Sequence, residues 1–150
     1  MTAAVAAHRL PLRVYYEDTD AAGIVYYANY LKFAERGRTE WMRALGFDHA
    51  RLHAERGVRF AVRRCEIDYL QPARLDELLV VETAVGGVRG ARLLLDQSVL
   101  RQETALCRLS ITLVLLDDAL RPVRLARALP PALLQALEAL AEENRGRPVS

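Results

Sequence analysis

A short acidic segment, Asp18-Thr19-Asp20, stands between two stretches of different hydrophobic periodicity. A carboxylate in such a place can attack an acyl carbon or take a proton from water, and acyl transfer uses a carboxyl group in one of these two roles. The next residues are Ala21-Ala22-Gly23, and a glycine adopts a positive φ without strain. The segment therefore predicts a tight loop that presents a carboxylate.

The spacing of apolar residues becomes helical from about Tyr27, so the loop stands directly ahead of a helix N-terminus. The N–H groups of a first helical turn lack partners within the helix and carry the positive end of its dipole. They can therefore hold a carbonyl oxygen that is gaining negative charge. A carboxylate on one side of a carbonyl group and backbone donors on the other form the minimum apparatus for acyl transfer.

The loop would be positioned by a strand before it and a long helix after it. Leu12, Val14 and Tyr16 recur with period 2, which predicts the strand. The helix is predicted over residues 27–45, with Gly46 in the C′ position that ends it. A glycine inside a helix costs about 1 kcal/mol relative to alanine, so Gly37 predicts a point where the sheet backbone comes too close for a β-carbon. The apolar stripe of this helix consists of Tyr30, Ala34, Gly37, Trp41 and Leu45.

The rest of the chain has the pattern of further strands and one more helix. The polar segment 48–56 predicts a short helix or a loop, and Pro130-Pro131 opens a C-terminal helix that runs to about Glu143. The predicted class is α+β, an antiparallel sheet of about five strands with one long helix to cover it, plus the C-terminal helix. The later strands are predicted at residues 58–70, 78–85, 91–100 and 105–116, with turn signals at Gln71-Pro72, Gly86-Gly87 and Gly90.

Length and composition describe an ordinary globular protein with a single domain over residues 1–150, whose ends, 1–10 and 144–150, are expected to be flexible. The net charge of +2 is too small to indicate nucleic acid, and no stretch reaches the about 18 apolar residues of a membrane span. Cys65 and Cys107 lack metal-ligand spacing, which favours reduced thiols and a cytoplasmic location. Dense apolar runs within the last two strands predict that another subunit covers part of the sheet.

The opening motif resembles a known family. The run from Asp18 to Tyr30, DTDAAGIVYYANY, and the segment from Phe33 to Glu40, FAERGRTE, resemble the hotdog-fold acyl-CoA thioesterases of the 4-hydroxybenzoyl-CoA thioesterase type. Within that family they are most similar to the thioesterase associated with the Tol–Pal system. The similarity continues through Asp68-Tyr69-Leu70, Pro72-Ala73 and Asp76, and spans about residues 11–125.

The resemblance implies a sheet wrapped around the central helix, protomers paired edge to edge and then into a tetramer, and active sites between subunits. Asp20 matches the catalytic carboxylate of the family, and the backbone N–H of Tyr27 matches the amide that polarises the thioester carbonyl. Arg89 matches an arginine that contacts the CoA phosphates in relatives. Gly90 and Ala91 depart from the fuller basic cluster there, which makes Arg92 a candidate substitute.

The side chain of Tyr27 differs between branches of the family. Many Tol–Pal-type relatives have histidine at this position, whereas the hydroxybenzoyl branch has tyrosine, so no histidine role carries over to this chain. The neighbouring carboxylates Asp18 and Glu17 are expected to shape the loop or face solvent. His49 and His53 could share a helical face, but no third ligand accompanies them, which favours a surface role over a zinc site.

The predicted function is hydrolysis of an acyl-CoA thioester to a free acid and CoA, without metal or redox cofactor. Two roles for Asp20 stay open, nucleophile through a mixed anhydride or general base on water. The acyl group also stays open between short aliphatic and aromatic. An alternative is a non-catalytic protein that binds acyl-CoA or acyl carriers, or an adaptor for an envelope-associated partner. A hotdog dehydratase is disfavoured because neither the loop nor the long helix contains a histidine.

Overall fold

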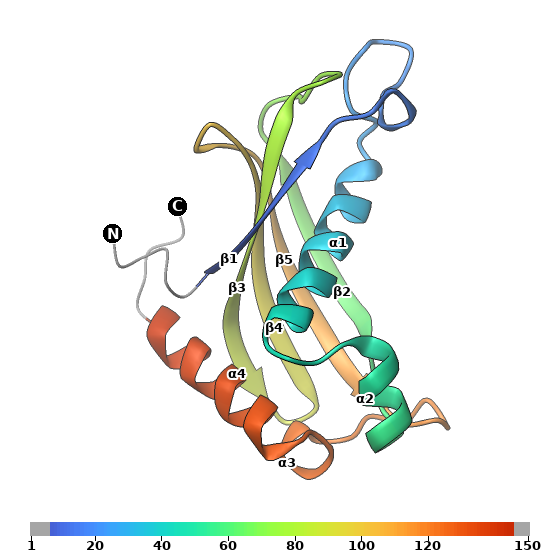
Figure 1. The fold of residues 1–150 in the computed structure, drawn as a ribbon, viewed down its shortest axis with the longest axis vertical. Coiled ribbons are helices and arrows are strands. Elements are labelled where there is room, and N and C mark those ends of the chain that lie inside the picture. The colour runs from blue at the N-terminus through green and yellow to red at the C-terminus, as the bar shows by residue number, and fades with distance from the viewer. Residues whose placement is uncertain (1–6, 146–150) are drawn as a thin grey trace.

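The computed structural model describes residues 7–145, which form one antiparallel five-stranded sheet with helices packed against it (Figure 1). The strand order is β1-β3-β4-β5-β2, so β1 and β2 are the two edge strands. The predicted α+β class and the number of strands are confirmed. The strands are β1 (Ala7–Arg13), β2 (Arg59–Tyr69), β3 (Leu78–Arg89), β4 (Arg92–Arg101) and β5 (Thr104–Leu116), and the helices are α1 (Asn29–Ala44), α2 (His49–Arg56), α3 (Leu125–Ala128) and α4 (Pro131–Asn144).

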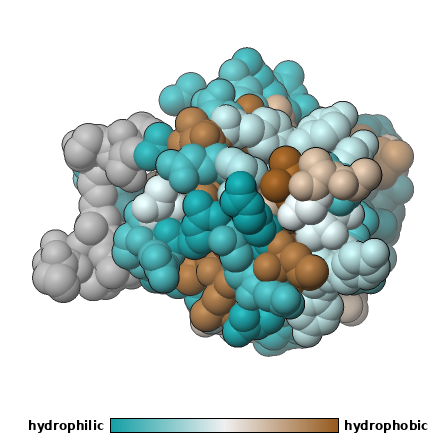
Figure 2. Space-filling view, turned by 90° about the horizontal axis from the view of Figure 1, so that it is seen from above, coloured by the Kyte–Doolittle hydropathy of each residue, from teal (hydrophilic) through white to brown (hydrophobic). Residues whose placement is uncertain are grey.

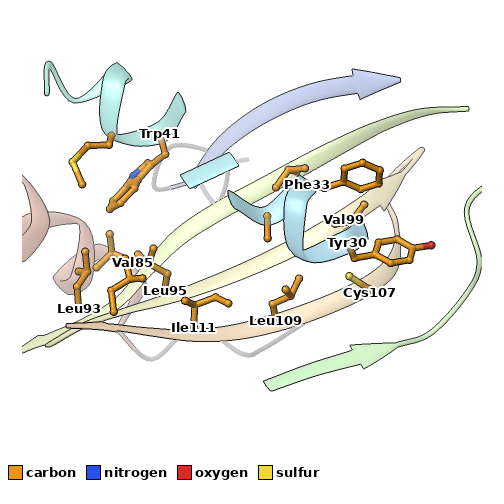
Figure 3. Packing of buried hydrophobic residues seen from close by; sticks show 14 of the residues in the cluster. Tyr30, Phe33, Trp41, Val85, Leu93, Leu95, Val99, Cys107, Leu109 and Ile111 are labelled. Carbon is orange, nitrogen blue, oxygen red and sulfur yellow. The ribbon is translucent and has the colours of Figure 1, made fainter. Parts of the chain in front are cut away.

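The hydrophobic core lies between α1 and the sheet (Figures 1 and 3). The stripe predicted for α1 lies on its buried face, where Trp41 is 4% exposed. Phe33, which the prediction did not include in the stripe, is fully buried on the same face. Figure 3 shows these side chains facing Leu95, Val99 and Ile111 of the strands below. Because this face is held by the sheet, α1 positions the loop that precedes it.

Gly37 lets α1 approach the sheet closely, as the sequence predicts. A β-carbon on Gly37 would lie 2.5 Å from Val81 Cγ1 and 3.2 Å from Gln97 Nε2, so the obstacle is side chains and not the expected sheet backbone. Gln97 is 2% exposed and its amide donates to the Ala34 carbonyl and to Thr83 Oγ1, each at 2.9 Å. The contact between α1 and the middle of the sheet is therefore polar at its centre.

The predicted end of β3 at residue 85, and the turn predicted directly after it, need correction. β3 continues through Gly86-Gly87 to Arg89, and a register shift between Val85 and Gly87 marks a bulge. A bulge leaves one residue unpaired while the strand continues, so the predicted turn at Gly86-Gly87 is wrong. The turn falls at Gly90, whose φ of +60° is one that glycine adopts freely.

The ends of the described chain are also more ordered than predicted. β1 begins at Ala7, which pairs with Ala84 of β3, so the predicted flexible leader is wrong for residues 7–10, and residues 1–6 lie outside the described range. β1 ends at Arg13, short of the predicted Tyr16, because Val14 bonds to Glu77 outside the ladder. At the other end, the Asn144 side chain donates to the Val85 carbonyl at 3.1 Å, and residues 146–150 lie outside the described range.

The shorter helices follow their local signals. Asp48 caps α2 by accepting from the Arg51 N–H at 2.7 Å, and Pro131 opens α4 as predicted. Leu133 and Leu137 of α4 are buried in the core. Between residues 7 and 145, no helix is long and apolar enough to cross a membrane.

Candidate active site

Asp18 shapes the loop between β1 and α1. Its carboxylate is buried and accepts from the Tyr15 N–H at 2.8 Å, while its carbonyl accepts from the Tyr26 N–H at 2.9 Å. The first bond closes the short 3₁₀ turn over Tyr16–Asp18, and the second holds the two ends of the loop together. Asp18 therefore has the loop-shaping place that the sequence predicts for it.

Asp20 lies at the exposed tip of this loop. Its Oδ1 accepts from the Ala22 N–H at 2.9 Å, and its carbonyl accepts from the Gly23 N–H at 3.0 Å. The Asp20 N–H donates to the Ile24 carbonyl at 2.9 Å, and Gly23 has the positive φ, +79°, that the sequence predicts. Oδ2 of Asp20 has no hydrogen-bond partner among residues 7–145, so this oxygen is open to a ligand or to water.

Tyr27 precedes α1 by two residues, because the first residue of the helix is Asn29 and not the predicted Tyr27. The Asn29 N–H donates to the Tyr26 carbonyl at 2.8 Å, and the Leu31 N–H donates to the Ala28 carbonyl at 3.1 Å. The N–H of Tyr27 has no acceptor in the described part of the chain. It lies one residue before the N-cap of α1, Ala28, and so adds a further unpaired donor next to the helix N-terminus, where an anionic oxygen can bind.

Two side chains that sequence reasoning missed hold Tyr27 in place. The buried amide of Asn29 donates to the Asp18 carbonyl at 2.9 Å and so ties the helix to the acidic loop. The phenol of Tyr69, at the end of β2, donates to the Tyr27 carbonyl at 3.0 Å. Asn29 stands inside the motif and could have been noticed as a polar residue at a helix start. Tyr69 could not, since it meets Tyr27 only through the fold.

Aromatic rings surround Tyr27 and the start of α1. Tyr69 packs edge-on to Tyr27 and to Tyr30, with ring centroids 6.0 Å and 5.6 Å apart. Burial raises the pKa of the Tyr69 phenol, which keeps its O–H a donor at neutral pH. The Tyr30 phenol accepts from the Ala73 N–H at 3.0 Å, so it joins α1 to the segment after β2. Figure 2 looks onto this end of the molecule and shows apolar patches broken up by polar and weakly polar residues.

Arg89 and Arg92 lie far from Asp20 within one protomer. They face each other across the β3–β4 turn, whereas the acidic loop follows Arg13, which pairs with Leu78 at the opposite end of β3. With 12 residues at about 3.3 Å each, β3 separates its two ends by about 36 Å. One chain therefore does not bring the predicted carboxylate and the predicted phosphate ligands together.

His49 and His53 take up the surface positions that the sequence predicts. His53 Nε2 lies 2.7 Å from Asp118 Oδ1, and the Arg59 guanidinium donates to the same carboxylate at 3.1 Å. This ion pair holds the pKa of the Asp118 carboxyl below its usual range. Within the described residues, no group of three His, Cys, Asp or Glu side chains is placed to hold a metal ion.

The surface is also hollowed away from the acidic loop. A groove of about 300 Å³ runs between α1 and β2, and a wider cleft of about 650 Å³ lies at the other end of the molecule, beside α2 and α3. The wider cleft is lined by four arginines, Arg56, Arg121, Arg124 and Arg127, together with Glu55 and Asp117. The groove is the hollow whose lining includes the first turn of α1.

The sequence and the fold of this chain are similar to those of known proteins. The sequence model of the family described as "Thioesterase-like superfamily" matches residues 14–137 of this chain. The chain belongs to the thioesterase-like superfamily. Acyl-CoA thioesterase YbgC of Haemophilus influenzae is 45% identical over 114 residues, which cover 75% of this chain and 84% of that protein. Acyl-CoA thioester hydrolase YbgC of Escherichia coli is 43% identical over 126 residues, which cover 84% of this chain and 92% of that protein.

Solved thioesterases share the fold. A probable thioesterase from Bartonella henselae superposes with a TM-score of 0.75 at 36% identity and covers 79% of this chain and 98% of its own. The DHNA-CoA thioesterase of Staphylococcus aureus superposes with a TM-score of 0.85 at 23% identity and covers 95% of this chain and 97% of its own. These structures confirm the predicted hotdog fold, and the YbgC relatives confirm the predicted enzyme class, an acyl-CoA thioesterase.

Proposed function

We propose that this thioesterase hydrolyses acyl-CoA to a free acid and CoA, with Asp20 as the reacting carboxylate and the Tyr27 N–H as the oxyanion donor. The observation that carries the proposal is that one tight loop holds both an exposed carboxylate oxygen and a backbone N–H without an acceptor. The names of the YbgC relatives supply the acyl-CoA substrate class. The same groups suit any thioester, because the developing oxyanion is common to the whole class.

Two routes are consistent with an exposed Asp20. In the first, an Asp20 oxygen bonds to the acyl carbon, the carbonyl electrons move to the oxygen held by Tyr27 N–H, and the C–S bond breaks to release the CoA thiolate. Water then hydrolyses the mixed anhydride. In the second, Asp20 takes a proton from the water that attacks. A pre-steady-state burst of CoA ahead of free acid supports the first route, and simultaneous release supports the second.

We propose further that the site is completed by a second copy of the chain paired through β2. Both edge strands could pair with a neighbour, but β1 contains Pro11, which has no N–H to offer, and β2 contains no proline. Antiparallel pairing of β2 with its copy turns the partner end for end. The β3–β4 turn of one protomer, with Arg89, then lies at the same end of the joined sheet as the Asp20 loop of the other protomer. One extended CoA could therefore reach the arginines of one copy and the carboxylate of the other.

The double variant Arg89→Ala/Arg92→Ala tests this arrangement. We expect KM for acyl-CoA to rise at least tenfold, because the loss of even one charge-assisted hydrogen bond to a phosphate, about 1.5 kcal/mol, is equivalent to a tenfold change. KM for the same acyl group on pantetheine, which lacks the nucleotide, should not change. Equal effects on both substrates would remove these arginines from phosphate binding.

Light scattering on the same samples measures the oligomeric state, for which we predict a dimer of dimers.

Tyr69→Phe tests whether the phenol positions the oxyanion donor. We expect kcat to fall about fivefold, the equivalent of one hydrogen bond of about 1 kcal/mol, while KM stays near the wild-type value. Tyr16→Phe is the control, since Tyr16 is 83% exposed. A rise in KM at constant kcat would show that Tyr69 contributes to ground-state binding instead.

The alternative, a protein that binds acyl-CoA or acyl carriers without turnover, predicts saturable binding and no released thiol. A thiol-release assay over a panel of acyl-CoAs separates the two functions. The cytoplasmic location and the envelope-associated partner implied by the Tol–Pal resemblance stay predictions.

A further inference from the structure

The groove between α1 and β2 begins one helical turn after the proposed oxyanion donor, Tyr27. Leu31, in the first turn of α1, begins its wall four residues after Tyr27, and Arg38 ends it two turns further along the helix. At 1.5 Å per residue, these two positions are about 10 Å apart along the helix axis. An acyl chain whose carbonyl rests on the Tyr27 N–H can therefore extend along this groove. Its remaining lining is Lys32, Glu35, Val62, Cys65 and Ile111.

Arg38 presents unused hydrogen-bond donors at the far end of the groove. One Nη1 N–H donates to Gln97 Oε1 at 3.0 Å, which fixes the guanidinium against the sheet. Arg38 is partly buried and forms no ion pair with any residue between 7 and 145. The Nε and Nη2 groups of Arg38 form no hydrogen bond within residues 7–145, and a fully buried polar atom of that kind would count as unpartnered. The only such atom in that range is His8 Nδ1, so Nε and Nη2 of Arg38 are accessible from outside.

The charges around the groove favour an anion. Arg38 and Lys32 are cationic, and Glu35 is the one carboxylate in the lining, close enough to interact with Arg38 through space but not hydrogen-bonded to it. Burial lowers the pKa of the Arg38 guanidinium without discharging it at neutral pH. A cation that is partly removed from water and has no carboxylate hydrogen-bonded to it binds a ligand carboxylate more strongly than an exposed cation does.

We propose that this groove holds the acyl group of the thioester and that Arg38 binds a carboxylate at the distal end of that group. The preferred substrates are then acyl-CoAs of short dicarboxylic acids, such as glutaryl-CoA and adipoyl-CoA. The inference rests on the proposed function, since it takes the carbonyl position from the Tyr27 N–H. A volume of about 300 Å³ lies at the small end of the range for ligand pockets, in agreement with a short acyl group.

The kinetic test compares adipoyl-CoA with hexanoyl-CoA, which has the same chain length and no distal charge. For the wild-type enzyme we expect kcat/KM to be at least tenfold higher with adipoyl-CoA. In Arg38→Met this ratio should fall by tenfold or more. In Arg36→Met, which removes an exposed arginine from the same helix, the ratio should not change. A wild-type ratio near one, or an Arg38→Met ratio equal to that of the wild type, overturns the proposal.

A binding test keeps the inference independent of turnover and of the stability of Arg38→Met. Cys65 lines the groove, whereas Cys107 is fully buried and burial raises its pKa to about 12, so a small thiol reagent should alkylate Cys65 alone in the folded protein. We expect adipate to slow the alkylation of Cys65 at least fivefold more than hexanamide, an uncharged six-carbon compound, at equal concentration, in the wild type and in Asp20→Asn alike. Equal rates with adipate and hexanamide overturn the inference. Selective protection without any thiol release upholds the groove assignment and rejects the proposed hydrolysis.

Discussion

Asp20→Asn should lower thioester turnover by about a thousandfold, the middle of the range in which general bases and carboxylate nucleophiles contribute. The substitution is nearly isosteric, and the amide oxygen of asparagine can still accept the Ala22 N–H that Asp20 Oδ1 accepts at 2.9 Å. The loop should therefore keep its shape, while the group that attacks or takes a proton loses its charge. The measurement is kcat for thiol release, with circular dichroism and size-exclusion chromatography to verify folding and assembly.

Glu17→Gln provides the control for this experiment. Glu17 is an exposed carboxylate three residues before Asp20 in the same loop, so its removal makes a similar change in local charge. We expect turnover within about twofold of the wild type, because an exposed charge at that distance is strongly screened. If Asp20→Asn retains more than a tenth of wild-type kcat, Asp20 is not the reacting group and the loop binds substrate only.

The parts of the site that depend on neighbouring residues could be predicted from the sequence. The glycine at position 23, the acidic loop and the helix after it are local features, and the structure places them within two residues of the prediction. The close approach at Gly37 was also predictable, because a glycine at a buried helical position implies a neighbour. The identity of the residues that Gly37 approaches was not predictable, since Val81 and Gln97 come from strands far away in the sequence.

The features that sequence reasoning missed or misplaced depend on contacts between distant segments. Gly86-Gly87 is a strong local turn signal, yet pairing with β4 carries the strand past it as a bulge. Residues 7–10 have no marked alternation, and pairing with β3 makes them a strand. Tyr69 reaches Tyr27 across 42 positions in the sequence. The distance between Arg89 and Asp20 follows from strand length and direction, which motif matching does not describe.

Gln97→Met should lower the free energy of unfolding by about 2–3 kcal/mol. Methionine keeps the length of the side chain but removes three hydrogen bonds, those to the Ala34 carbonyl, to Thr83 Oγ1 and from Arg38. Each is worth about 1 kcal/mol net, and the more apolar methionine offsets part of the loss. Urea unfolding followed by circular dichroism measures the change.

The matched control is Gln135→Met, the same substitution at an exposed position of α4, where we expect a change of less than about 0.5 kcal/mol. A double-mutant cycle with Thr83→Val then isolates the bond between Gln97 and Thr83, and its coupling energy should be about 1 kcal/mol. A loss below about 0.5 kcal/mol for Gln97→Met would mean that the polar centre under α1 contributes little to stability. In that case the main effect of Gln97 is on Arg38, because its amide holds the guanidinium in one orientation at the end of the groove. The ratio of kcat/KM for adipoyl-CoA to that for hexanoyl-CoA should then fall in Gln97→Met even though the free energy of unfolding does not.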